Sequence, residues 1–198
     1  AGTSVKGSNN ASLGKDAGKA VEGNDNAAFG SNAGELVKGT QNTGFGRAAG
    51  KGVQGNSNTS LGNGAGMNLQ GDGNLSAGLS AGQGTYGDPN IMLGKHASTV
   101  GSKPGAKINH TVVIGSKAKA HFDDTVALGS EAKAEHENSV ALGHASQTAA
   151  AAQVNSAVIN TEVDGKTGTF TYSGFAGTAS GVVSVGSAGA ERQIINVA

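Results

Sequence analysis

The residues of this chain with the greatest potential for chemistry are its histidines, which are His96, His110, His121, His136 and His144. A metal site on a helix would place two histidines four residues apart, and no two histidines here have a close spacing of that kind. The chain also lacks cysteine, so disulfides and thiolate metal sites are excluded. We therefore expect solvated histidines, no metal and no cofactor.

Two other chemical patterns have simpler explanations. The abundant glycines match phosphate-loop spacings by chance, but no strand–loop–helix context surrounds them. Asn-x-Ser/Thr triplets, which accept glycans in eukaryotic secreted proteins, begin at Asn10, Asn58, Asn74 and Asn109. Three of these asparagines belong to a repeated column, where turn formation explains them. No catalytic residue is predicted, and the chain is not expected to be an enzyme.

The overall charge limits the partners of the chain. With 14 acidic and 14 basic residues, the formal net charge is zero, which argues against nucleic-acid binding. No apolar run has the length of a membrane helix, and no signal peptide is visible at Ala1. We expect a soluble segment of a longer protein that does not itself contact a membrane, with the charges around Lys117, Lys119, Glu131 and Lys133 forming a solvated face.

Three glycine columns with a period of 16 residues dominate the first half of the chain. They are Gly7, Gly23, Gly39, Gly55, Gly71 and Gly87; Gly14, Gly30, Gly46, Gly62, Gly78 and Gly94; and Gly18, Gly34, Gly50, Gly66 and Gly82. A constant period of this length is typical of stacked repeats, each of which has a core only when its neighbours cover it. The sequence therefore predicts a solenoid.

The composition and the pattern within each repeat indicate which solenoid this is. A chain with 35 glycines and two prolines does not suit a helical array, and its glycines lack the spacing of collagen. Apolar and small residues alternate before the second glycine column, which predicts a short strand, and a second strand is expected around Val21 and Val37. The prediction is an all-β parallel β-roll, with glycine and the asparagine column (Asn10, Asn26, Asn42, Asn58, Asn74 and Asn90) at positive φ.

The repeat changes length after Gly94. An insertion lies around Ser102-Lys103-Pro104-Gly105, and the pattern then resumes every 14 residues at Val112-Val113-Ile114-Gly115, Val126-Ala127-Leu128-Gly129 and Val140-Ala141-Leu142-Gly143. Nine coils can be counted in the sequence. At about 4.8 Å per coil, they make a rod about 40 Å long.

Such a rod has a thin interior, in which we expect the Leu or Phe, the Val and the Ala of each coil. The opposite face of the strands would then carry mostly small residues, which are Ser12, Ala28, Gly44, Ser60, Ser76, Met92, Val113, Ala127 and Ala141. Small side chains would allow rolls to pack closely side by side. We infer an oligomer from this pattern.

The C-terminal quarter departs from the repeat. An alanine run at residues 149–152 is followed by strand-like alternation on both sides of Asp164-Gly165, a dipeptide that favours tight hairpin turns. The sequence therefore predicts three parts: a β-roll over residues 1–150, a β-hairpin insert over 151–183 and a closing segment over 184–198.

Two motifs resemble the trimeric autotransporter adhesins of Gram-negative bacteria. The segments Asp124-Thr125-Val126-Ala127-Leu128-Gly129 and Asn138-Ser139-Val140-Ala141-Leu142-Gly143 look like the NSVAxG-type head repeats of the YadA-like subgroup. The closing sequence VSVGSAGAERQIINVA looks like the neck that joins such a head to its coiled-coil stalk. The resemblance covers nearly the whole chain.

This resemblance implies a left-handed β-roll, a homotrimer and display at the bacterial cell surface, with an outer-membrane anchor formed by a C-terminal translocator absent from this segment. It also implies a role in virulence through adhesion to host matrix proteins such as collagen, fibronectin or laminin. The ligand-binding residues carried over from the repeat are Asn138, Ser139, Val140, Ala141, Leu142, Gly143, His144, Ala145 and Ser146. Val140, Leu142 and Gly143 are also expected at core and turn positions. The neck residues expected where three chains converge are Glu191, Arg192, Ile194, Ile195 and Val197.

Other functions remain open. The chain could be a structural spacer or a bacterial self-association module. Left-handed β-helical acyltransferases also repeat aliphatic residues, but their period of six residues divides neither 16 nor 14. Calcium-binding β-rolls would need an aspartate column, and ice-binding solenoids would need ranks of threonine; neither is present.

Overall fold

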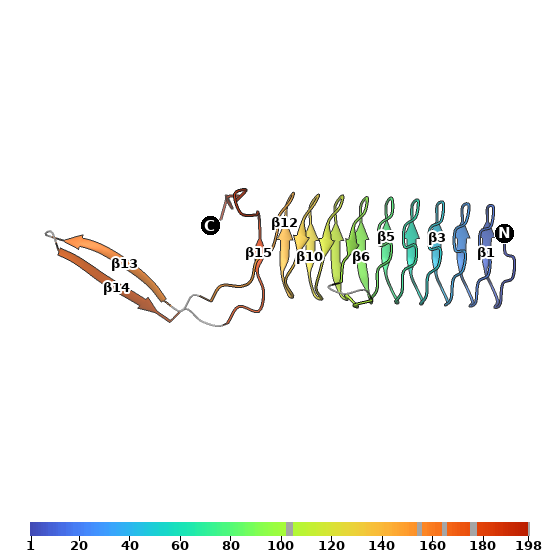
Figure 1. The fold of residues 1–198 in the computed structure, drawn as a ribbon, viewed down its shortest axis with the longest axis horizontal. Coiled ribbons are helices and arrows are strands. Elements are labelled where there is room, and N and C mark those ends of the chain that lie inside the picture. The colour runs from blue at the N-terminus through green and yellow to red at the C-terminus, as the bar shows by residue number, and fades with distance from the viewer. Residues whose placement is uncertain (102–104, 154–155, 164–165, 175–177, 198) are drawn as a thin grey trace.

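The chain folds into a rod of stacked coils followed by a separate two-stranded ribbon (Figure 1). The computed structural model describes residues 1–101, 105–153, 156–163, 166–174 and 178–197. Over these residues the fold is all-β, and no helix is present that could cross a membrane. Most of the predicted insertion, at residues 102–104, lies outside the described residues.

One wall of the rod is a parallel sheet to which each coil contributes a strand. Ser12 pairs with Ala28, so the register advances by one repeat at each step. The ten strands in spatial order are β1 (Ala11–Leu13), β2 (Ala27–Phe29), β3 (Thr43–Phe45), β4 (Thr59–Leu61), β5 (Leu75–Ala77), β6 (Asn90–Leu93), β8 (Thr111–Ile114), β10 (Val126–Leu128), β12 (Val140–Leu142) and β15 (Val183–Ser184). The nine strands from β1 to β12 in this sheet define eight complete turns of a parallel β-solenoid.

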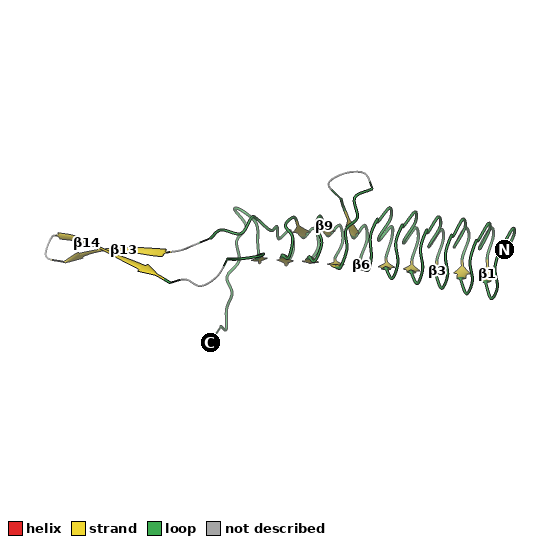
Figure 2. Ribbon diagram, turned by 90° about the horizontal axis from the view of Figure 1, so that it is seen from below, coloured by secondary structure: helices red, strands yellow, loops and turns green. Residues whose placement is uncertain are grey.

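The chain returns along a second wall that is less regular (Figure 2). In the 16-residue coils this wall is joined by isolated parallel bridges such as Lys38↔Gln54, so the second strand expected around Val21 and Val37 is reduced to one bridge next to each valine. In the later coils it forms a small three-stranded sheet of β7 (Ser98–Thr99), β9 (Lys119–Ala120) and β11 (Lys133–Ala134).

The interior corrects our assignment of the two strand faces. Leu13 is 68% exposed and Phe45 is 60% exposed, so the large residues of the strands point outward. The small residues expected on the outside instead point inward, where Ala28 and Ala141 are buried. The Val column, in contrast, is buried as expected. The gap between the walls explains the difference, because a Cβ added at Gly34 would lie only 2.8 Å from the Cβ of Ala28.

The asparagine column also differs from our expectation. The positive φ angles belong to the residues just before it, including Asn9, Asp25 and Gln41. The column itself turns its side chains inward, and Asn58, Asn74 and Asn90 are fully buried. These asparagines form a hydrogen-bonded ladder through the solenoid.

The ribbon consists of β13 (Ser156–Val163) and β14 (Lys166–Ser173), which pair antiparallel. The Asp164-Gly165 turn expected between them lies outside the described residues. The chain then returns to the end of the solenoid, where Val183 pairs with Val140, and continues without helix to residue 197.

Candidate functional site

The proposed ligand-binding segment lies in the last 14-residue coil, and its side chains point in different directions. Asn138 and His144 are exposed. The side chains of Ser139, Ala141 and Ser146 are buried inside the coil. A ligand on the surface cannot touch these three, so their role in the repeat is structural.

The two buried serines bind the backbone of neighbouring segments. Ser139 Oγ donates to Glu137 O at 3.0 Å and accepts from the backbone N–H of Val182 at 3.0 Å. Ser146 Oγ donates to Leu142 O at 2.7 Å and accepts from Arg192 Nη1 at 3.1 Å. The bonds to Val182 and Arg192 connect the last coil to the segment that follows the ribbon.

Val140 and Leu142 belong to a different surface, the outer face of the ten-stranded sheet. Their positions continue two columns of side chains along the whole sheet, and we call these columns the apolar sheet face. Its members at the first strand position, apolar except for two threonines, are Ala11, Ala27, Thr43, Thr59, Leu75, Ile91, Val112, Val126 and Val140. Its members at the third strand position, paired in register, are Leu13, Phe29, Phe45, Leu61, Ala77, Leu93, Ile114, Leu128 and Leu142. The rings of Phe29 and Phe45 lie 5.6 Å apart between centroids. An apolar face of this length is a surface for association rather than for chemistry.

The alternation of large and small residues in each strand is the sequence signal for this surface. Our prediction that the large residues point inward is wrong. The alternation correctly predicts each strand, but alternation alone does not say which of the two strand faces points inward. Side-chain size decides the question, because the interior has room for Ala, Ser or Gly opposite the Val column, and a Phe would not fit.

The predicted neck residues lie on the surface of the single chain. Ile194 and Ile195 are each 71% exposed, and Val197 is exposed too. Arg192 bonds within its own chain, from Nη2 to His144 O at 2.6 Å and from Nη1 to Val185 O at 2.8 Å. The carboxylate of Glu191 accepts from the backbone N–H of Gly189, and this bond lowers its pKa below the ordinary value.

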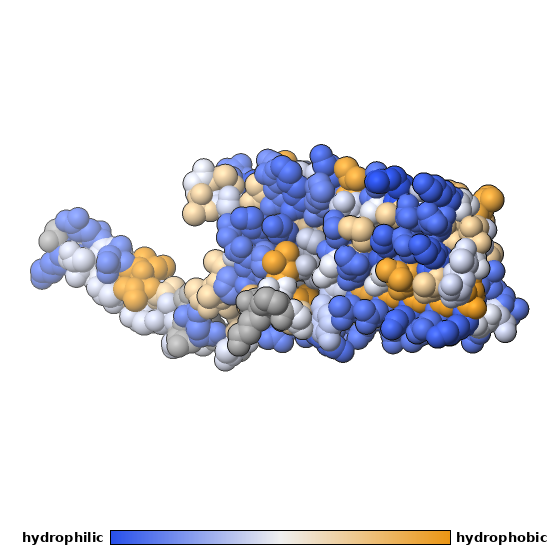
Figure 3. Space-filling model, turned by 45° about the vertical axis from the view of Figure 1, so that its right-hand side comes forward, coloured by the Kyte–Doolittle hydropathy of each residue, from blue (hydrophilic) through white to orange (hydrophobic). Residues whose placement is uncertain are grey.

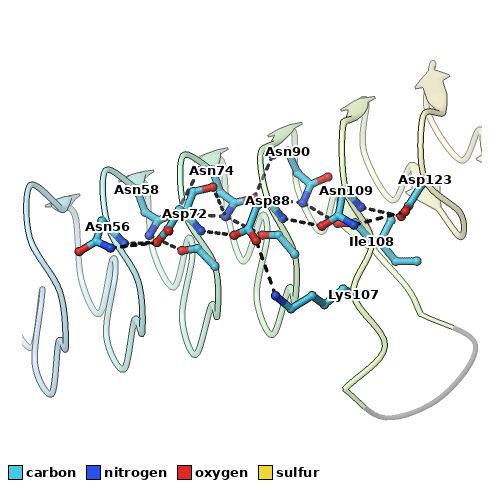
Figure 4. A network of polar contacts seen from close by, with 12 residues as sticks. Asn56, Asn58, Asp72, Asn74, Asp88, Asn90, Lys107, Ile108, Asn109 and Asp123 are labelled. Atoms are coloured by element: carbon cyan, nitrogen blue, oxygen red, sulfur yellow. Dashed lines mark hydrogen bonds and ion pairs between the residues drawn. The ribbon is translucent and has the colours of Figure 1, made fainter.

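A second polar ladder follows the outer turn of the coils (Figure 4). The side-chain oxygen of each residue accepts from the backbone N–H one coil earlier, as in Asn56 N–H to Asp72 Oδ1 at 2.6 Å and Asn109 N–H to Asp123 Oδ1 at 2.8 Å. Asp88 in this ladder also lies 3.8 Å from Lys107 Nζ. The carboxylates are therefore occupied by backbone donors and a lysine, and their role is to hold successive coils together.

The histidines are dispersed over the coils. Among the described residues, no group of three His, Asp or Glu side chains is arranged to hold a metal ion. His96, His110 and His144 are exposed as expected, and His110 Nδ1 lies 3.4 Å from Asp124 Oδ1. His121 and His136 are half-buried, which corrects the expectation that all five are solvated. Burial lowers the pKa of His121.

Two surface hollows have room for a small molecule. One of about 400 Å³ lies beside the predicted neck residues and is lined by Gln147, Ala149, Val185, Glu191 and Arg192, among others. A smaller one of about 200 Å³ is lined by Gln54, Gln70, Gly71, Tyr86 and Lys107. Ser184, Ser187 and Glu191 also line the larger hollow, but Ser184 Oγ donates to Gly186 O, Glu191 accepts from the backbone N–H of Gly189, and no hydrogen bond joins a serine to Glu191 among the described residues, as hydrolytic or transfer chemistry would need.

Comparison with known proteins identifies the repeat. Residues 109–132 and 123–146 each match the family model described as the YadA head domain repeat. The two matches are offset by one 14-residue coil and cover β8 to β12. No curated protein matches the chain. The two matched repeats, and the solenoid that they continue, support a YadA-like trimeric autotransporter adhesin head domain.

Proposed function

We propose that the protein is the head of a homotrimeric adhesin that binds host extracellular matrix from the bacterial surface. The observation that carries this proposal is the pair of YadA head repeats in the solenoid. The YadA head family is an adhesin family and not an enzyme family, and its heads form trimers and bind host matrix in general.

The apolar sheet face is the proposed trimer interface. In a single chain it leaves Phe45, Leu61, Leu128 and Leu142 exposed to water. Three copies that turned this face toward one axis would bury a continuous apolar column along the solenoid. The proposal includes two further features. The coil is left-handed, as the family implies, and Ile194, Ile195 and Val197 of the three chains converge into a coiled-coil stalk.

In the proposed trimer, only some of residues 138–146 remain available to contact a ligand. Val140 and Leu142 would lie in the trimer interface, and three other members of the segment are buried side chains. Asn138, Gly143, His144 and Ala145 remain available on the outer turns of the coil. Collagen, fibronectin and laminin are the proposed ligands, bound by weak contacts repeated along the rod and around the trimer.

The family also supports the proposed location. YadA-like adhesins are surface autotransporters anchored in the outer membrane. We extend this location, and a role in virulence, to the present protein. The neck would then lead from the head toward the stalk and the membrane.

A solid-phase assay tests the function. Immobilised collagens, fibronectin and laminin are probed with the purified protein, with His144→Ala, and with a variant lacking residues 24–55, which are two complete coils. We expect saturable binding to at least one matrix protein, and a change of at most several-fold for His144→Ala. The deletion should fold, because each coil contacts only its neighbours.

Two outcomes would contradict the proposal. Absence of binding to all of these ligands by a folded trimer would favour the spacer, and clumping of bacteria that display the head would favour self-association. Complete loss of binding in His144→Ala without unfolding would indicate one discrete site instead of repeated contacts.

A further inference from the structure

The ribbon of β13 and β14 carries an apolar side that nothing in its own chain covers. Directly paired residues of an antiparallel ribbon lie on the same side. One side therefore carries the pairs Ala157↔Tyr172, Ile159↔Phe170 and Thr161↔Gly168, with Lys166 of the last pair at the far end of the ribbon. We call the six residues of the first three pairs the ribbon face. Ile159 is 51% exposed, and Phe170 and Tyr172 are each 56% exposed.

The opposite side of the ribbon is mostly polar. It presents Val158, Asn160 and Glu162 from β13 and Thr167, Thr169 and Thr171 from β14. Thr169 Oγ1 donates to Asn160 Oδ1 at 3.0 Å across the strands. This side suits contact with water, so the ribbon is amphipathic.

The ribbon projects beyond the last coil, away from the solenoid (Figures 1 and 3). Figure 3 shows an apolar patch on it, separated from the rest of the surface. β13 and β14 have each other as their main contacts among the described strands. An isolated two-stranded hairpin is marginally stable in water, and a covered apolar face is what stabilises it. The ribbon therefore needs a cover outside its own chain.

We propose that this cover is the ribbon face of the other copies of the chain, so that three ribbons pack face to face beyond the solenoid. This inference rests on the trimer proposed above. The outgoing arm follows the return wall of the last coil, where Gln147 bridges Lys133, and the returning arm rejoins the ten-stranded sheet at Val183, so the ribbon leaves the solenoid at its C-terminal end. Ala179 N–H donates to Gln153 Oε1 at 3.1 Å, which holds the two arms together at the base of the ribbon. A trimer of the head therefore brings three ribbons to the same level.

The composition of the ribbon face favours identical copies over an unrelated partner. Its six paired residues carry no charge, and the one charged residue described on this side, Lys166, lies at the far end of the ribbon, where its long exposed side chain can reach water. Gly168 lies opposite Thr161 and lacks a side chain, which lets the ribbons approach closely at that pair. A copy of the chain is also present whenever the trimer is, whereas a host ligand would leave the face exposed between encounters.

The absence of cysteine from the chain permits a direct test by disulfide cross-linking. Thr161→Cys places a thiol on the ribbon face, and Thr167→Cys makes the same change on the polar side. Both variants are oxidised and run on non-reducing gels, and light scattering of each reports its mass. We expect covalently linked chains for Thr161→Cys and little linkage for Thr167→Cys, with a trimer mass for both.

The outcomes separate the two proposals. A trimer mass without preferential linkage of Thr161→Cys would overturn the packing of the ribbons and leave the trimeric head intact. A monomer mass would overturn both.

Hydrogen exchange in residues 156–163 and 166–173 gives a second readout that needs no cross-link. Ile159→Ser and Val158→Ser change adjacent residues of similar exposure on opposite sides of the ribbon. We expect faster amide exchange throughout the ribbon for Ile159→Ser than for Val158→Ser. Equal exchange in the two variants would also overturn the proposal.

Discussion

The side-chain Nδ2 of Asn58 donates to the side-chain Oδ1 of Asn42, 3.0 Å away in the preceding coil. The same Nδ2 donates to Gly71 O at 2.7 Å, and Asn58 Oδ1 accepts from the backbone N–H and the Nδ2 of Asn74. One buried amide thus bonds to groups in the coil before and the coil after its own, and it joins three consecutive coils. Asparagine suits this position because it carries a donor and an acceptor together.

Replacement of Asn58 by Ala should therefore destabilise the solenoid. The change leaves the carbonyl of Gly71 and the backbone N–H of Asn74 without partners, at about 1–3 kcal/mol for each unpaired group. Thermal unfolding followed by circular dichroism measures the effect. Asn63→Ala is the matched control, since Asn63 is exposed, and it should leave the melting temperature nearly unchanged. Equal melting of the two variants would show that the ladder does not stabilise the fold.

The glycine columns should differ in their tolerance of alanine. A Cβ at Gly55 would lie 2.0 Å from Gly71 O, whereas a Cβ at Gly84 meets nothing within 4 Å. Both glycines have positive φ, so Gly84→Ala should cost about 1–2 kcal/mol of backbone strain. Gly55→Ala should lose more stability, because adjacent coils must also move apart. Denaturant unfolding of the two variants checks the order, and a smaller loss for Gly55→Ala would contradict the close stacking.

The sequence was sufficient to predict the solenoid and its register. Gly55 and its equivalents recur at a fixed spacing because each turn packs against the next, so the period reports the stacking directly. The orientation of the strand faces was not predictable in the same way. Ala28 and Phe29 alternate equally well with either residue inside, and only the narrow gap between the walls decides between them. The side-chain ladder of the asparagines was missed because asparagine is also a common turn residue.

The candidate site shows the same limit. Residues 138–146 were carried over as one segment, but a strand alternates its sides, so Ala141 faces the interior while Leu142 faces outward. His121 is half-buried because of the way consecutive coils overlap. The spacing of residues in the sequence does not predict this overlap.

The apolar sheet face predicts a clear result for Phe45→Asp. Phe45 is exposed in the single chain, so in a monomer this change would have little effect on stability. In the proposed trimer it would bury three carboxylates near one axis, and we expect dissociation or a marked loss of thermal stability. Gln54→Asp places the same charge on the exposed return wall and serves as control. Light scattering measures the mass, and a stable trimer for Phe45→Asp would exclude this interface.

The neck gives an independent prediction. Ile194→Asp should weaken the trimer if the exposed isoleucines converge with those of other copies, because an unpaired charge would then be buried. Gln193→Asp, at the adjacent exposed residue, should have a smaller effect. Thermal melting of the trimer compares the two, and unchanged melting of Ile194→Asp would place Ile194 outside the interface.

His121 should make the stability of the fold depend on pH. The residue is half-buried, and within the part of the chain that the structure describes its buried Nδ1 has no hydrogen-bond partner. Burial is the largest cause that lowers the pKa of His121; Glu135 opposes the shift, and Lys119 and Lys133 add to it. The folded protein therefore binds a proton at this site less readily than the unfolded chain does.

The sign of the effect follows from this difference. Above the unfolded pKa of about 6.5, His121 is neutral in both states and has no pH-dependent influence on stability. As the pH falls from there through the lowered pKa of the folded state, the unfolded chain takes up the proton first, and stability is lost. His121→Gln should lose less stability than the unaltered protein over this interval. His96→Asn serves as the control. His96 is exposed and has a φ of 57°, which asparagine tolerates, so this variant should retain the original pH dependence. Melting temperatures of the three proteins across the interval check the prediction, and identical slopes for His121→Gln and the unaltered protein would show that another group is responsible.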